Sequence, residues 1–225
     1  MMRRIWNRVS KRVPGMLKRR VPPEIRNAIG LSFDQSSAII KFGWSRSRTL
    51  GLPVDAEGIA LPWYTYPAIR FLETRLPPGL SVFEYGMGNS TLWWSKRAIY
   101  VESCEHDEKW FNYMKVNLPH NVLAHLHPVN SNEYTNAVTK ANHKVDILVI
   151  DGRRRVACAR AATQVLTTQS VVIWDNSDRD YYRSGFKELS DHGFTGRIDF
   201  WGMGPINVYE WCTSIFYGAD NCLGL

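Results

Sequence analysis

Short apolar runs alternate with segments of mixed polarity through the middle of the chain. The runs occupy residues 80–85, 98–104, 122–126, 145–150 and 170–174, and the segments between them include residues 91–96, 107–117 and 156–166. Apolar runs of roughly four to eight residues predict buried strands, and the intervening segments predict helices. This alternation is typical of a parallel sheet that has helices on both faces.

The pattern changes on both sides of this region. Before it, residues 68–72 have the apolar spacing of a helix, which the Pro-Pro-Gly sequence at 77–79 ends. After it, apolar segments at 198–201 and 208–216 flank a glycine-containing loop at 202–205, which predicts a β-hairpin. We therefore expect the C-terminal part of the sheet to contain a hairpin.

The composition is that of a globular domain. A chain of 225 residues with 44% hydrophobic residues, 9 Trp and 10 Tyr is suited to one α/β domain with an N-terminal extension. The cysteines show no C-x-x-C or metal-ligand spacing, so we expect reduced core thiols in a cytoplasmic protein. No apolar run reaches the length of about eighteen residues that a membrane-spanning helix needs.

Positive charge is concentrated at the N-terminus. Residues 1–20 contain eight Lys or Arg and no acidic residue, and the rest of the chain has 20 basic and 21 acidic residues. The net charge of +7 therefore belongs to this arm, which makes a nucleic-acid partner for the domain unlikely. Three interpretations of the arm stay open: a short amphipathic helix on an anionic membrane surface, an organellar transit peptide, and a disordered solubilising extension.

A strand end, a glycine turn and a helix start follow one another in the segment VFEYGMGNST at residues 82–91. Gly86 and Gly88 allow a sharp turn and a close approach of the backbone to a ligand. Ser90 and Thr91 can cap the helix that follows. Such a segment forms a nucleotide-type cradle, although an ordinary tight turn between a strand and a helix has the same pattern.

A carboxylate follows the second predicted strand. In nucleotide-binding α/β folds, an acidic residue about twenty residues after the glycine turn accepts hydrogen bonds from the ribose hydroxyls. Glu105 has this offset from Gly86. Glu102 is the competing candidate, but its position within the strand predicts that it points to one face of the sheet.

The pattern Glu84-x-Gly86-x-Gly88-x-Ser90-Thr91, followed by Glu105, His106, Asp107 and Trp110, resembles the class I S-adenosylmethionine-dependent methyltransferases over residues 60 to 217. The similarity is greatest to bacterial small-molecule and sugar-pathway enzymes whose first motif ends in Gly-Asn-Ser-Thr. The resemblance implies a Rossmann-like, mostly parallel seven-stranded sheet with helices on both faces and a C-terminal antiparallel hairpin. We expect S-adenosylmethionine to be bound by Glu84, Gly86, Gly88, Ser90, Glu105 and Asp151.

Acidic and amide side chains follow the fourth and fifth predicted strands. Asp151 comes after the run at 145–150, and Asp175 and Asn176 come after the run at 170–174. These oxygen ligands suit Mg²⁺, and the catechol-type O-methyltransferases place similar residues around a metal. A metal there would lower the pKa of an attacking hydroxyl. The alternatives are that Asp151 or Asp175 acts as a general base without a metal, and that these side chains only stabilise their loops.

Aromatic and basic side chains near the expected site are candidates for substrate contacts. Methyl transfer needs a dry pocket, and the π faces of aromatic rings favour sulfonium charge. The candidate walls are Trp63, Tyr64, Tyr66 and Trp174, although each of them also suits the core. Arg153 opens a run of three arginines before a predicted helix and is a candidate clamp for an acidic or phosphorylated substrate.

We expect three parts of the chain: a basic N-terminal arm (residues 1–23), a helical and loop segment on the substrate side (24–79) and an S-adenosylmethionine-binding domain (80–225). We expect a methyltransferase that acts on an oxygen of a small molecule or sugar precursor. Two other classes stay open. A nicotinamide dinucleotide oxidoreductase would need a third glycine and a second mononucleotide-binding half, and neither is visible. A membrane-surface binding protein would keep the fold without the chemistry.

Overall fold

The structure, a computed structural model, describes residues 21–225, apart from the side chains of residues 32 and 33. The eight basic residues of the N-terminal arm lie outside the described residues. The expectation that this arm contacts a membrane therefore concerns residues outside the described part of the chain. Within residues 21–225, no helix combines the length and the apolar character needed to span a membrane.

One sheet of seven strands, in the order β3-β2-β1-β4-β5-β7-β6, organises the described chain. The strands are β1 (Ser81–Tyr85), β2 (Tyr100–Glu105), β3 (Val122–Leu126), β4 (Ile147–Ile150), β5 (Val171–Asp175), β6 (Gly196–Gly202) and β7 (Trp211–Tyr217). Strands β1 to β5 are parallel, and β7 is antiparallel to both β5 and β6. The predicted mostly parallel sheet with a C-terminal antiparallel hairpin is confirmed.

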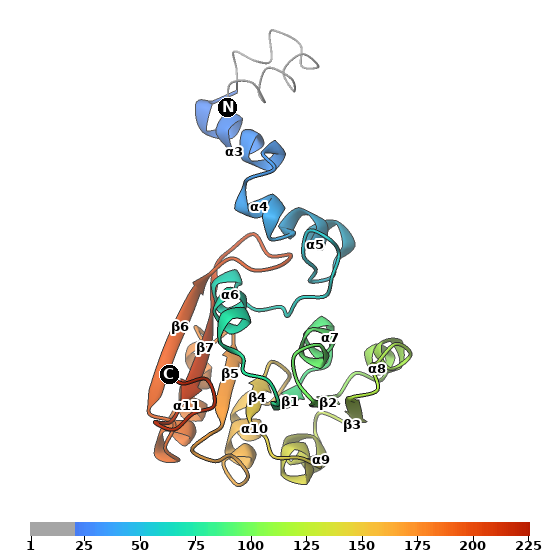
Figure 1. Cartoon of the computed structure of the whole chain (residues 1–225), viewed down its shortest axis with the longest axis vertical. Helices are drawn as coiled ribbons and strands as arrows, with labels where there is room; N and C mark the ends of the chain where they lie inside the picture. Colours follow the sequence, from blue (N-terminus) through green and yellow to red (C-terminus); the bar gives the residue numbers. More distant parts are fainter. Residues whose placement is uncertain (1–20) are drawn as a thin grey trace.

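Helices lie on both sides of this sheet (Figure 1). They are α3 (Pro23–Phe33), α4 (Ala38–Lys41), α5 (Trp44–Leu50), α6 (Tyr66–Arg75), α7 (Asn89–Ser95), α8 (Glu108–Lys115), α9 (Asn132–Thr135), η2 (Ala137–Lys140), α10 (Arg155–Ala162), η3 (Asp180–Tyr182) and α11 (Arg183–Asp191). Helices α6 and α7 contribute to one hydrophobic cluster, and α9, α10 and α11 contribute to another.

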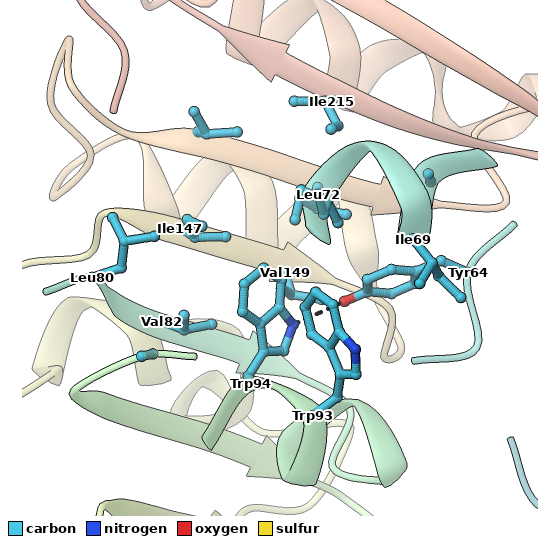
Figure 2. Packing of buried hydrophobic residues seen from close by; sticks show 14 of the residues in the cluster. Tyr64, Ile69, Leu72, Leu80, Val82, Trp93, Trp94, Ile147, Val149 and Ile215 are labelled. Atoms are coloured by element: carbon cyan, nitrogen blue, oxygen red, sulfur yellow. Dashed lines mark hydrogen bonds between the residues drawn. The ribbon is translucent and has the colours of Figure 1, made fainter. Parts of the chain in front are cut away.

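The two clusters take alternate residues of the central strands. Ile147 and Val149 of β4 belong to the cluster with α6 and α7, whereas Leu148 and Ile150 belong to the cluster with α10. Successive side chains of a strand point to opposite faces, so a strand covered on both faces is apolar at every position. This explains the continuous apolar runs in the sequence. Figure 2 shows the first cluster, in which Trp93 and Trp94 of α7 and Tyr64 pack among the apolar side chains of the sheet and α6.

The N-terminal segment is attached to the C-terminal hairpin. The Trp44 Nε1 of α5 donates a hydrogen bond to the Asn207 carbonyl at 2.7 Å, and the Thr65 amide donates one to Thr213 Oγ1 of β7 at 3.0 Å. Figure 1 shows α3 and α4 beyond α5, away from the sheet. The loop that follows α5 then returns to the sheet edge where strands β1 and β4 end.

Helix α11 is one of the observed helices that have no counterpart among the predicted elements. Helix α11 contains Gly185, which weakens a helical pattern in sequence because glycine is a poor helix former. The structure gives the reason for the glycine: a Cβ at position 185 would lie 2.5 Å from a ring carbon of Trp174. The close contact between α11 and β5 thus requires a residue that disfavours the helix locally.

Candidate functional site

A cavity of about 430 Å³ opens at the carboxyl ends of the parallel strands. The turn after β1 contributes residues 86–90, the end of β2 contributes Glu105 and His106, and the loop after β4 contributes Asp151 to Arg153. Ligands of open α/β sheets bind at this edge. The topology therefore brings together most of the site residues predicted from the sequence.

Gly86 makes the sharp turn after β1. Its φ of 100° lies in a region that other residues rarely adopt, and an added Cβ would lie 3.1 Å from the amide nitrogen of Gly152. Glycine is therefore required here by the protein's own backbone.

Gly88 is a different case. Its φ of −179° is accessible to any residue, and the nearest atom to an added Cβ, the Ser90 Oγ, would be 4.0 Å away. Gly88 lines the cavity, so a side chain here would occupy the space open to a ligand. Nothing in the described chain requires a glycine at this position. A ligand that closely approaches the backbone would require one.

Glu84 lies beneath this turn and not in the cavity wall. Its Oε2 accepts a hydrogen bond from Thr91 Oγ1 at 2.5 Å, and Thr91 Oγ1 in turn accepts one from the Gly88 amide at 3.0 Å. The carboxyl therefore holds the glycine turn against the start of α7. Within the described chain, Glu84 Oε1 is buried without a hydrogen-bond partner.

The environment of Glu84 favours its neutral form. Burial raises its pKa to about 7, and this effect outweighs the opposing influence of the neighbouring Ser90, Thr91 and Ser103 hydroxyls. A carboxyl in this position gains from a cationic partner, which would stabilise its charged form.

Glu105 lines the cavity, as predicted, and Glu102 does not. The Oε2 of Glu105 accepts a hydrogen bond from the Met87 amide at 3.1 Å, and its Oε1 accepts one from the Asp107 amide at 2.8 Å. The carboxylate thus links the glycine turn to the start of α8, and its Oε2 keeps lone-pair capacity toward the cavity. Glu102 lies 3.2 Å from His125 Nε2, on another part of the sheet.

Trp110 belongs to the motif that carries the resemblance and lines the cavity, although no contact was predicted for it. Asp107 caps α8 by accepting a hydrogen bond from the Trp110 amide at 2.9 Å. The indole Nε1 of Trp110 then donates a hydrogen bond to the Met87 carbonyl at 2.5 Å. The spacing of Asp107 and Trp110 is a helix-capping signal that could have placed this ring beside the glycine turn.

Asp151 lines the cavity, but Asp175 does not. Asp175 is buried, and its Oδ1 accepts hydrogen bonds from Trp211 Nε1 at 2.9 Å and Thr213 Oγ1 at 2.6 Å. Asp175 therefore stabilises the contact between β5 and β7, and its prediction as a catalytic group is corrected. Burial raises the pKa of both aspartates above the usual range.

The predicted Mg²⁺ site does not fit the residues present, because a guanidinium lies among the proposed ligands. Arg155 Nη2 is 2.9 Å from Asp151 Oδ1 and 3.5 Å from Asn176 Oδ1, and Arg155 Nη1 donates to the Asp175 carbonyl. Among the described residues, no cluster of three His, Cys, Asp or Glu is arranged to bind a metal. Arg155 already supplies the positive charge that these oxygen atoms attract.

The predicted aromatic walls separate into one cavity residue and three core residues. Trp63 lines the cavity and is 42% exposed. Tyr64 is fully buried, and its hydroxyl accepts a hydrogen bond from Trp94 Nε1 at 3.3 Å (Figure 2). Tyr66 and Trp174 are also buried. Their assignment to substrate contacts is corrected, because their rings supply the apolar contacts of the two clusters.

Two arginines complete the cavity wall. Arg153, predicted as a substrate clamp, lines the cavity, and Arg179, which the sequence did not single out, lies there as well. Arg179 follows Asn176, whose φ of 51° is unusual for a residue other than glycine. This turn after β5 carries Arg179 to the cavity, and no sequence signal marks it.

No protein-family profile matches the sequence, and no curated protein matches it significantly. Among solved structures, the chain is similar to precorrin-6y C5,15-methyltransferase from Geobacter metallireducens, with a TM-score of 0.53 and 14% identity over 68% of this chain and 87% of the other. A TehB-like S-adenosylmethionine-dependent methyltransferase from Corynebacterium glutamicum has a TM-score of 0.48 and 13% identity over 77% of this chain and 95% of the other. With its seven-stranded sheet and antiparallel β7, the described chain has the Rossmann-like fold of the class I S-adenosylmethionine-dependent methyltransferases.

Proposed function

We propose that this protein is an S-adenosylmethionine-dependent methyltransferase that acts on an oxygen of a small molecule or a sugar precursor. The observation that carries the proposal is Gly88, which lines the cavity although neither its φ nor its neighbours require a glycine. The buried carboxyl of Glu84 beneath the same turn does not line the cavity, and its charged form would attract the cofactor's ammonium through the turn.

The chain offers separate groups to separate parts of this cofactor. The backbone of residues 86–88 would face its amino-acid end, and Glu105 would accept hydrogen bonds from its ribose hydroxyls. Bound there, the cofactor supplies an electrophilic methyl group.

Asp151 is the group suited to accept a proton from the acceptor hydroxyl. It lines the cavity, and burial raises its pKa toward the range in which a carboxylate is an effective base. Its Oδ1 is held by Arg155 at 2.9 Å, which fixes the direction of the carboxylate. Fixed groups around a cavity favour displacement because they remove the cost of orienting the reactants.

The sheet order argues against a nicotinamide dinucleotide enzyme. Such enzymes pair two mononucleotide-binding halves in a parallel sheet of order 3-2-1-4-5-6. Here the antiparallel β7 lies between β5 and β6, so the second half is not completed.

Isothermal titration of the full chain with S-adenosylhomocysteine and with NAD tests the proposal. We expect binding of S-adenosylhomocysteine only, and we expect Gly88→Val to weaken it by about tenfold or more because the new side chain fills the ligand's space. Gly30→Val is the matched control, since an added Cβ at Gly30 contacts nothing within 4 Å and Gly30 is remote from the cavity.

Equal affinity of the parent and Gly88→Val would contradict the assignment of the site. Binding of NAD in preference to S-adenosylhomocysteine would overturn the proposed function. The unfolding midpoint of Gly88→Val should stay close to that of the parent, which separates loss of binding from loss of folding.

A further inference from the structure

A second cavity, of about 540 Å³, adjoins the first at the start of α10. The two cavities share Gly152, Arg153, Arg155 and Arg179. Volumes of this size are typical of small-molecule sites. A molecule in the second cavity would therefore lie next to Asp151, which lines the first.

The wall of the second cavity contains five arginines and no acidic residue. They are Arg153, Arg154, Arg155, Arg160 and Arg179. Residues 21–225 contain 20 basic and 21 acidic residues, so this part of the chain has no general excess of positive charge. The five arginines are therefore a local concentration of positive charge.

Two of the five arginines are neutralised by the protein itself. Arg155 pairs with Asp151 at 2.9 Å, and Arg160 pairs with Glu188 at 2.7 Å. Arg154 Nη1 instead donates to the backbone carbonyl of Ser131 at 3.1 Å. These three side chains have partners that hold them in place.

Arg153 and Arg179 remain available to bind an anionic ligand. Neither has a carboxylate within 4.0 Å in the described part of the chain, and the partners of Arg179 there are the neutral hydroxyls of Tyr181, at 3.2 Å, and Tyr182. Both side chains lie where the two cavities meet. Cations close to the first turn of a helix are unfavourable, because the positive end of the helix dipole lies there, so an anion between them would be stabilising.

We propose that the second cavity binds a phosphate or carboxylate group of the methyl acceptor. Arg153 and Arg179 would hold this anionic group, since the guanidinium fork matches the paired oxygens of both groups. Tyr181 and Tyr182 add aromatic surface and hydroxyl donors for the remainder of the molecule. The inference rests on the proposed function, and it narrows the acceptor to an anionic small molecule.

Titration of the full chain with pyrophosphate and with citrate, each in the presence and absence of S-adenosylhomocysteine, tests this inference. We expect at least one anion to bind, and we expect R153Q/R179Q to weaken its binding by about tenfold or more. The control is R70Q/R183Q, which removes the same charge from the exposed pairs of Arg70 with Glu73 and Arg183 with Asp180. Tighter binding of pyrophosphate would identify a phosphate acceptor, and tighter binding of citrate a carboxylate acceptor.

A second readout distinguishes this cavity from the basic N-terminal arm. Phenylglyoxal modifies accessible arginines, and peptide mass spectrometry reports each of them separately. The bound anion should protect Arg153 and Arg179 and leave Arg70 unprotected. Absence of binding by either anion, equal weakening in the control variant, or protection confined to residues 1–20 would overturn the inference.

The two proposals fail in different measurements. If S-adenosylhomocysteine does not bind the parent, the proposed methyltransferase function fails, whereas the anion titration without that ligand still decides the nature of the second cavity. If S-adenosylhomocysteine binds and neither anion does, only the anionic acceptor is excluded.

Discussion

Glu84 shows how one buried side chain can serve both the fold and the site. Its Oε2 connects to the glycine turn through Thr91, and this keeps the backbone of Gly88 at the cavity. Its Oε1 has no partner in the described chain. The Glu84 carboxyl is buried, and burial raises its pKa to about 7. Its charged form therefore reduces the stability of the free protein, and a cationic ligand would lower that cost.

The raised pKa of Glu84 predicts a pH-dependent stability. The folded carboxyl has a pKa of about 7 against an ordinary value of 4.5, so the folded state binds more protons between these values. The free energy of unfolding should therefore fall as the pH rises from about 4.5 to about 7, by on the order of 3 kcal/mol. Glu84→Gln should remove the part of this dependence that Glu84 contributes and leave the part that comes from Asp151 and Asp175.

Urea unfolding of the parent and of Glu84→Gln, measured from about pH 5 to about pH 8, checks this prediction. The free energy of unfolding of the variant, relative to that of the parent, should increase as the pH rises. If the free energy of unfolding has the same pH dependence in both proteins across this range, Glu84 does not titrate near neutrality.

Helix α10 joins the ends of two neighbouring strands through its first residue. Arg155 is 6% exposed and contacts Asp151 after β4 and the carbonyl of Asp175 at the end of β5. Arg160, one and a half turns later, has an exposed pair with Glu188 of α11. The same residue type therefore has a buried role and a surface role within one helix.

Arg155→Gln and Arg160→Gln should differ strongly in stability. Removal of the buried guanidinium leaves Asp151 without its charge partner, which should lower the free energy of unfolding by about 3 kcal/mol. Loss of the exposed pair should cost less than about 1 kcal/mol. Urea denaturation at neutral pH measures both values, and a similar loss in the two variants would contradict the assigned role of Arg155.

At the scale of the whole molecule, charge is divided between the N-terminal arm and the domain. Residues 1–20 carry eight basic residues, whereas residues 21–225 have nearly balanced charges. Figure 1 shows that α3 and α4, the first helices of the described chain, lie away from the sheet. We therefore propose that the arm brings the protein to anionic membrane surfaces without taking part in cofactor binding.

Deletion of residues 1–20 should abolish binding to acidic liposomes, because each basic residue near such a surface contributes roughly 1 kcal/mol. Co-sedimentation with phosphatidylserine-containing vesicles at low and high salt measures this, and vesicles of phosphatidylcholine alone are the control. The affinity for S-adenosylhomocysteine should not change. Binding that is independent of the arm, or insensitive to salt, would contradict this role.

Local patterns were sufficient for the sheet and for the glycine turn. The apolar runs identified β1 to β5, and they are continuous in β4 and in residues 171–174 of β5 because strands covered on both faces must be apolar at successive positions. The positions of Gly86 and Glu105 relative to these strands placed both residues at the carboxyl edge, since parallel strands end on the same side. These features depend on spacing within short segments, which a sequence displays directly.

Only the tertiary structure decided which side chains reach the cavity. Trp63 and Tyr64 are neighbours in sequence, yet one lines the cavity and the other is buried against Trp94. Asp175 follows the same strand-end pattern as Asp151, but the hydrogen bonds from β7 turn it away. The roles of Arg155 and Arg179 depend on segments distant in sequence, because burial and charge pairing are set by contacts across the fold rather than by spacing along the chain.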